Sequence, residues 1–193
     1  MSEIEAGLRD LIQRIKSRRP RDVLAALSDT VPLLEFNNFA VSDPEYYEQV
    51  VPAALRERPL SADEQVLIVQ VIEEAIIEEL ITRRESTLTG LLSTLRQAHL
   101  WDAAPVLLEI LVNEEPQLSV KELHAAVDAL FGSLQAFDDD DPHVSDVRAT
   151  FGALDPRPVL NRARRMRPAE PHGCLPEDAE WILRRLSERN LIT

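Results

Sequence analysis

Residues 61–85, SADEQVLIVQVIEEAIIEELITRRE, constrain the fold more than any other stretch of this chain. Ser61 followed by Glu64 is typical of a capping box, and no Pro or Gly interrupts residues 62–85. On a 3.6-residue period the apolar side chains cover most of the circumference. The single polar row that remains has i,i+4 spacing and consists of Gln70, Glu74, Glu78 and Thr82. A helix that is apolar nearly all round must be covered on more than one side. We therefore predict a buried central helix.

The first part of this stretch, VLIVQVI, would also suit a buried strand because it is mostly β-branched. Its continuation into IEEAIIEELITRRE favours a helix, and Glu79 lies four residues before Arg83. The other periodic segments are also helical. We expect helices over 2–18, from Pro20 to Thr30, after Pro32, from Ser86 or Thr87 to Leu100, after the cap Asp102, after the capping box Ser119–Glu122, after Asp155-Pro156 and over 177–189. The gaps are mostly short, which places neighbouring helices antiparallel. The expected fold class is all-α.

Two segments share one pattern, Val31–Leu55 and Ala104–Leu134. Each has a Pro near the start of an apolar helix, then an acidic turn containing Pro, then a second apolar helix. The second segment resembles a HEAT repeat through Pro105, Leu107, Leu108, Ile110, Leu111, the turn Asn113–Pro116, Val120-Lys121, Ala125, Ala126, Ala129, Leu130 and Gly132. The resemblance implies a right-handed alpha-alpha superhelix, a short helical-repeat solenoid in which stacked helix pairs share one core. An irregular helical bundle is the alternative.

The expected domain organisation follows from composition along the chain. Residues 1–166 are predicted to form the helical-repeat domain. Residues 167–176, RPAEPHGCLP, contain three Pro and one Gly and indicate a linker. Residues 177–193 are predicted to form a closing helix that docks on this domain or extends it.

The negative charge is concentrated in one part of the sequence. Residues 61–142, the acidic segment, carry 17 acidic and 4 basic residues, which equals the net charge of −13 of the whole chain. Nucleic-acid binding needs cations that release counterions, so we expect no nucleic-acid partner. An acidic surface attracts basic proteins, although it also serves simply to keep a protein soluble. No apolar run approaches ~18 residues and Cys174 is the only cysteine, so we expect a cytoplasmic protein with no membrane contact and no disulfide.

No catalytic or metal-binding pattern is evident. A dimetal site in a helical bundle needs Glu-x-x-His, which does not occur, and the run Asp138–Asp141 lacks the Gly and the alternating ligands of a calcium loop. The cluster Arg162, Arg164, Arg165 and Arg167 has no interleaved aromatic residues for base stacking. Cys174 follows His172 and Gly173 in the predicted linker, where a Cys–His pair rarely holds its geometry. We expect no catalytic, cofactor-binding or metal-binding residues.

These observations favour a non-enzymatic adaptor that holds another protein with a basic surface on an acidic face or groove. The predicted partner-binding residues are Glu73, Glu74, Glu78, Glu109, Glu114, Glu115, Asp138, Asp139, Asp140, Asp141 and Trp181. Trp181 also suits a second role, packing back on the end of the array as a cap. An immunity or antitoxin-type protein that neutralises a basic toxin is the alternative. A third hypothesis is an enzyme whose site is assembled only in three dimensions, from several of His99, His124, Glu109 and Asp128.

Overall fold

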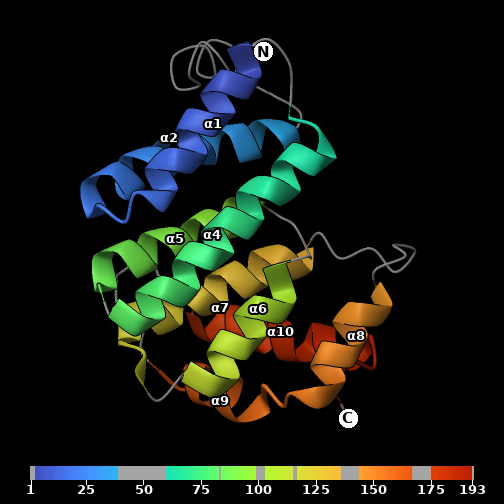
Figure 1. The fold of residues 1–193 in the computed structure, drawn as a ribbon. Helices are drawn as coiled ribbons and strands as arrows, with labels where there is room; N and C mark the ends of the chain where they lie inside the picture. Colours follow the sequence, from blue (N-terminus) through green and yellow to red (C-terminus); the bar gives the residue numbers. More distant parts are fainter. Residues whose placement is uncertain are drawn as a thin grey trace. The chain divides into compact units, whose positions relative to one another are not determined.

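The computed structural model describes residues 3–38, 60–82, 84–98, 103–114, 117–135, 144–166 and 175–192. Within these ranges every regular element is a helix and there is no strand, which confirms the all-α class (Figure 1). The chain divides into two compact units, Met1–Ala98 and His99–Thr193.

The described part of the first unit contains four helices: α1 (Glu3–Lys16), α2 (Pro20–Asn38), α4 (Ala62–Thr82) and α5 (Glu85–Ala98). Helix α2 packs against α1 and α5, and α4 packs against α5 and α1. Their facing sides bury long aliphatic side chains at 3.6-residue spacing, which is what holds short helices in place. The largest of these are Leu11, Ile15, Leu34, Ile68, Ile72, Ile76, Leu88, Leu91, Leu92 and Leu95.

Helix α4 begins as the sequence predicts. The backbone N–H of Ser61 donates to Glu64 Oε2 at 2.7 Å, and the N–H of Glu64 donates to Ser61 Oγ at 3.3 Å. This reciprocal pair satisfies two N–H groups that have no partner inside the helix. The predicted helix and its capping box are confirmed.

The coverage of α4 differs from the prediction. Ile68, Ile72 and Ile76 are fully buried, but Ile77 is 53% exposed and Ile81 is 78% exposed. Among the described elements only α5 and α1 pack extensively on α4, so one side of the helix remains open. The predicted burial of this helix is therefore found on the side that packs against α5 and α1, whereas the side that carries Ile77 and Ile81 is exposed.

Helix α2 also differs from the prediction, because it runs unbroken from Pro20 to Asn38. We expected the first part to end near Thr30 and Pro32 to start a new helix. Pro32 lies inside the helix, where its ring nitrogen has no hydrogen to donate to the carbonyl of Ser28. Packing of α2 against two neighbours, including the fully buried Leu34, outweighs this local cost. The remainder of the predicted repeat Val31–Leu55, from 39 onward, lies outside the described residues.

The described part of the second unit is built around α7. Its elements are α6 (Ala104–Glu109), the π-helix η3 (Ile110–Glu114), α7 (Val120–Gln135), α8 (Val144–Ala153), α9 (Arg157–Ala163) and α10 (Leu175–Glu188). Helix α7 contacts α6, η3, α9 and α10, while α8 packs on α6. This arrangement matches the burial of α7, in which Ala126, Val127, Ala129 and Leu130 are inaccessible to solvent. The two apolar helices predicted within Ala104–Leu134 are therefore present and in contact.

A side-chain capping box starts α7. Ser119 and Glu122 form the predicted capping box of α7, with the Ser119 N–H donating to Glu122 Oε2 at 2.7 Å and the Glu122 N–H to Ser119 Oγ at 3.3 Å. At α9 the cap position is Pro156, which makes no side-chain cap hydrogen bond, and Asp155 Oδ1 just before it accepts the Arg157 N–H at 3.0 Å. At α6 the cap position is Ala103, which has no side-chain cap; Asp102, the predicted cap, lies outside the described residues.

The closing helix begins earlier than predicted. Helix α10 starts at Leu175, so the last two residues of the predicted linker belong to it. It packs against α7 and α9. Residues 167–174 lie outside the described part of the chain.

Candidate interaction surface

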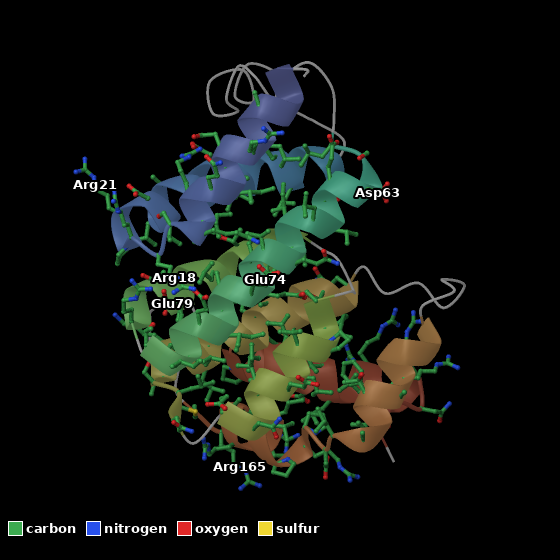
Figure 2. All side chains as sticks on the ribbon, in the orientation of Figure 1. Arg18, Arg21, Asp63, Glu74, Glu79 and Arg165 are labelled. Atoms are coloured by element: carbon green, nitrogen blue, oxygen red, sulfur yellow. The ribbon has the colours of Figure 1, made fainter. Side chains whose placement is uncertain are left out.

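The open face of α4 is the surface that combines exposed apolar and charged groups. Its apolar members are Leu67, Ile77 and Ile81, which are 42%, 53% and 78% exposed. Asp63, Gln70 and Glu74 are the exposed polar residues that share this side of the helix. Figure 2 shows Glu74 midway along α4, between Asp63 near its start and Glu79 near its end. Ile77 and Ile81 are one turn apart and form an apolar patch at the C-terminal half.

Basic side chains at the end of α1 neutralise part of the predicted acidic face. Lys16 Nζ lies 3.0 Å from Glu74 Oε2, and Arg18 Nη2 donates to Glu78 Oε1 at 2.6 Å. All four side chains are at least 44% exposed, so each pair contributes at most ~1 kcal/mol to stability. Where α4 borders α1, Lys16 and Arg18 thus balance the charges of Glu74 and Glu78. The sequence offered no signal for this pairing, because the partners are about 60 residues apart.

A buried carboxylate closes the C-terminal end of α4. The Glu79 side chain is 4% exposed, and Arg84 donates hydrogen bonds to both of its carboxylate oxygens. Nε donates to Oε2 at 2.9 Å, and Nη2 donates to Oε1. Thr82 Oγ1 also donates to Glu79 Oε2, at 3.1 Å. The sequence predicted an i,i+4 pair of Glu79 with Arg83, but the described partner is Arg84, just beyond the helix. A charged carboxylate is tolerated in this buried position only because hydrogen-bond donors satisfy its oxygens.

The same arginine ties α4 to the end of α1. Arg84 Nη1 donates to the backbone carbonyl of Arg18 at 2.7 Å. Arg18 has a positive φ of 60°, the left-handed conformation that ends many helices. Glu78, Glu79, Arg84 and Arg18 therefore form one charged corner that fixes the chain after α1 against the C-terminus of α4.

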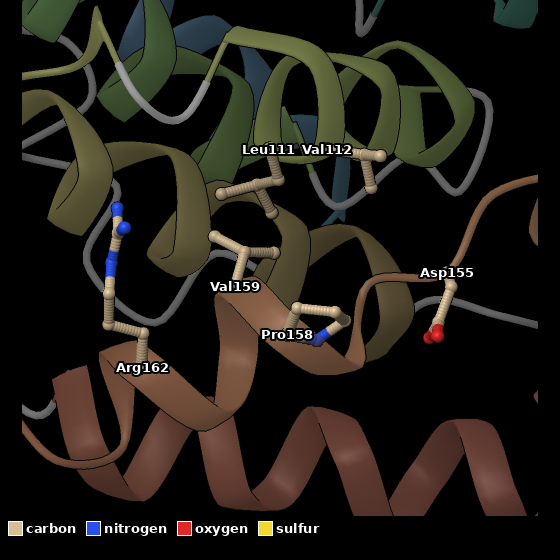
Figure 3. Close-up of a pocket in the computed structure, with 6 residues that line it drawn as sticks. All are labelled: Leu111, Val112, Asp155, Pro158, Val159 and Arg162. Atoms are coloured by element: carbon tan, nitrogen blue, oxygen red, sulfur yellow. The ribbon is translucent and has the colours of Figure 1, made fainter.

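The second unit contains a small open hollow between η3 and α9. Its volume is about 180 Å³, and it is lined by Leu111, Val112, Asp155, Pro158, Val159 and Arg162. Figure 3 shows Arg162 at one end and Asp155 at the other, with the apolar residues between them. Small-molecule sites are usually ~300–1,000 Å³, so this hollow is too small and too open to enclose a substrate.

Asp155 at the rim of this hollow is already paired with Arg157. Arg157 Nε donates to Asp155 Oδ1 at 2.7 Å and Arg157 Nη2 donates to Oδ2 at 2.9 Å. These side-chain hydrogen bonds lower the pKa of Asp155 and outweigh burial, which raises it; the Arg157 backbone N–H lowers it further. The same bonds raise the pKa of Arg157. The Asp155 carboxylate is therefore paired with the Arg157 guanidinium.

Trp181, the aromatic residue among the predicted partner-binding residues, packs within its own unit. Trp181 on α10 meets Phe131 on α7 edge to face, with ring centroids 4.7 Å apart. Trp181 is half-buried, so the contact uses part of its surface. This geometry agrees with the packing role that we considered for Trp181.

The remaining predicted acids fall in separate places. Glu73 and Glu114 are half-buried and each makes a polar interaction, whereas Glu109 is exposed on α6. Glu73, Glu74 and Glu78 are brought together on α4, and Glu109 and Glu114 lie in the other unit. Glu115 and Asp138, Asp139, Asp140 and Asp141 are outside the described residues.

A catalytic or metal-binding arrangement is not found in the described ranges. They contain no group of three or more His, Cys, Asp or Glu side chains that could hold a metal ion. Of the residues considered for an enzyme site, His124 and Asp128 are half-buried on α7 and Glu109 is exposed on α6, while His99 lies outside the description. No helix in the described ranges is long and apolar enough to cross a membrane. In comparisons with protein families, characterised proteins and solved structures, nothing matches this chain.

Proposed function

We propose that this chain is a non-enzymatic protein–protein interaction module of the adaptor type, and that it binds another protein through the open face of α4. The observation that carries the proposal is the exposure of Ile77 and Ile81, 53% and 78%, on a helix whose opposite side is fully buried. Clustered exposed apolar residues rimmed by polar groups mark interaction sites in folded proteins. Covering Leu67, Ile77 and Ile81 gains roughly 3 kcal/mol from apolar burial, enough to anchor a modest interface.

The partner that we propose has a basic surface. The acidic segment supplies the long-range attraction, through Glu73, Glu74 and Glu78 in one unit and Glu109, Glu114, Glu115 and Asp138–Asp141 in the other. Lys16 and Arg18 already balance Glu74 and Glu78, so on α4 the apolar residues supply the affinity, and the other acids of the acidic segment guide the encounter. Binding should therefore weaken with salt, chiefly through a lower association rate.

The finer architecture that we propose is a short HEAT-like array of stacked helix pairs. Its support is the pairing of α6 and η3 with α7 in the segment Ala104–Leu134 that resembles the repeat. In such arrays each helix pair contacts its neighbours and leaves a face for extended partners.

Capture from native lysate with matched variants tests the function. Ile81→Asp places a charge on the open face at a position whose side chain packs little, so the fold should be kept. Val120→Asp is the control, because Val120 is an exposed apolar residue, 46% accessible, at the start of α7 in the other unit. We expect proteins bound by the wild-type bait to be retained by Val120→Asp and lost by Ile81→Asp, with both variants melting like the wild type. Equal retention by the two variants would refute the proposed surface, and recovery of a basic toxin would identify the immunity-protein alternative.

A further inference from the structure

Two of the three apolar residues on the open face of α4, Leu67 and Ile81, are placed symmetrically about Glu74 and its ion pair with Lys16; Ile77 has no such counterpart, because Val71 is buried. Leu67 lies seven residues before Glu74, and Ile81 lies seven residues after it. Seven residues are two helical turns less about 20°, so the three side chains share one side of α4 and each apolar residue is about 10 Å along the axis from Glu74. All three are exposed.

From this symmetry we propose that a second copy of this chain docks on the open face of α4, antiparallel, with the two-fold axis at Glu74. The proposal rests on the proposed function in one respect, namely that this face is a docking surface, and a second copy then competes with the basic partner for it. A two-fold interface is self-complementary, so a residue at +7 from the axis meets the residue at −7 of the other copy. Leu67 of each copy then covers Ile81 of the other, and both contacts form at once. An unrelated partner would not require Glu74 to lie at the midpoint.

The charges at the axis are also self-complementary. Glu74 Oε2 is 3.0 Å from Lys16 Nζ, and these side chains are 66% and 54% exposed. Two copies related by the axis bring two carboxylates and two ammonium groups together, and alternation of the four charges removes the repulsion between the two Glu74 side chains.

The charges near the two ends of α4 are also complementary when two copies of the helix pack antiparallel. Asp63 is exposed near the start of the helix, eleven residues before Glu74, while Arg18 lies beside the opposite end and holds Glu78 there (Figure 2). An antiparallel copy brings Asp63 to the end that carries Arg18, and it also pairs the positive terminus of each helix dipole with the negative terminus of the other.

The association is expected to be weak and to respond to salt in a characteristic direction. One helix per copy covers less than the ~800 Å² per partner of a standard interface, which indicates a concentration-dependent dimer. Each copy carries a net charge of −13, so the copies repel at long range. Salt screens this repulsion and strengthens self-association, whereas it weakens binding of a basic partner.

Single-cysteine cross-linking of the full chain tests the geometry, with Cys174→Ser as the background. Under mild oxidation we expect Glu74→Cys to form a disulfide dimer at least tenfold faster than Glu180→Cys, an exposed position on α10. Leu67→Cys and Ile81→Cys should each cross-link slowly alone and quickly when mixed, because position 67 faces position 81 of the other copy. Sedimentation velocity should show a dimer fraction that rises with protein concentration and with salt, and that falls at least tenfold in Ile81→Asp.

Three results would overturn the proposal. Cross-linking of Glu74→Cys no faster than that of Glu180→Cys would mean that no two-fold axis passes through position 74. Fast cross-linking of Leu67→Cys alone would indicate a parallel pair. A wild-type protein that stays monomeric at all concentrations would exclude self-association altogether. If lysate capture still depends on Ile81 in any of these cases, the docking surface stands and its occupant is another protein; if capture is also independent of Ile81, both proposals fail.

Discussion

Arg84 holds the buried carboxylate of Glu79 with two nitrogens and donates a third hydrogen bond to the carbonyl of Arg18. The Glu79 side chain is 4% exposed and that of Arg84 is 32% exposed. This single residue therefore satisfies a buried charge and joins two segments that are 66 positions apart. Such a pair confers little net stability relative to an apolar replacement, but removing one member leaves the other without its partner.

We expect Glu79→Gln to lower the free energy of unfolding by about 2–3 kcal/mol, because charged hydrogen bonds inside the fold are lost. The matched control is Glu78→Gln at the preceding residue, whose ion pair with Arg18 is exposed. The free energy of unfolding of this control should change by less than about 0.5 kcal/mol. Urea unfolding of the full chain, followed by circular dichroism, measures both. Equal effects of the two substitutions would contradict the buried role of Glu79.

The two sides of α4 should respond very differently to truncation. Ile72→Ala and Ile76→Ala remove fully buried side chains and should each cost ~2–5 kcal/mol. Ile81→Ala removes a side chain that is 78% exposed, and we expect a change below about 0.5 kcal/mol. Denaturant midpoints of the three variants give the comparison. A cost below ~1 kcal/mol at Ile72 would mean that this side of α4 is not packed.

The two confirmed capping boxes allow a further test. Ser61→Ala and Ser119→Ala each remove the side-chain oxygen that accepts a backbone N–H at the start of α4 or α7. We expect each to lower stability by ~1 kcal/mol, while replacement by Thr or Asp keeps most of it. Thermal and urea unfolding measure these changes. An Ala variant as stable as the wild type would show that the box does not contribute in solution.

Two glycines in helices make a matched pair. An added Cβ at Gly152 in α8 meets nothing within 4 Å, so Gly152→Ala should raise the free energy of unfolding by about 0.5 kcal/mol through helix propensity. At Gly90 in α5 the added Cβ would lie 3.1 Å from Leu24 Cδ2 and 3.4 Å from Leu27 Cδ1. Leu27 is buried and Leu24 is 39% exposed, so one or both must shift to admit the methyl group, and Gly90→Ala should gain less stability than Gly152→Ala. An equal gain at both positions would contradict the close approach of α2 and α5.

The pKa of Asp155 can be measured directly by a carboxyl NMR titration. We expect its midpoint below the ordinary value of ~3.9, because Arg157 donates side-chain hydrogen bonds to the carboxylate. A lowered folded-state pKa means that the stabilisation is present above the unfolded value and is lost as pH falls through the folded value. Arg157→Gln should raise the midpoint toward the ordinary value, although the backbone N–H at 157 remains as a donor. An unchanged midpoint in that variant would assign the shift to another group.

Local patterns in the sequence predicted local structure well. The apolar period and the Ser–Glu spacing of 61–64 and 119–122 predicted α4, α7 and their caps, because these features depend on residues within one or two turns. The break expected at Pro32 was wrong, since contacts of α2 with α1 and α5 decided the continuity of that helix. The acids of α4 were identified as a surface row, but their pairing with Lys16 and Arg18 could not be inferred from helical spacing.

The sequence by itself determined that this chain folds into amphipathic helices, where two of them begin, and that its net charge of −13 lies in 61–142. These properties follow from residues that are neighbours along the chain. Only the tertiary structure decided that Ile77 and Ile81 remain exposed while Ile72 and Ile76 are buried, and that Glu79 is held by Arg84. The physical reason is that the narrow polar row Gln70, Glu74, Glu78 and Thr82 marks a polar side without its width, so how many flanking apolar residues stay exposed depends on which neighbouring helices pack against α4.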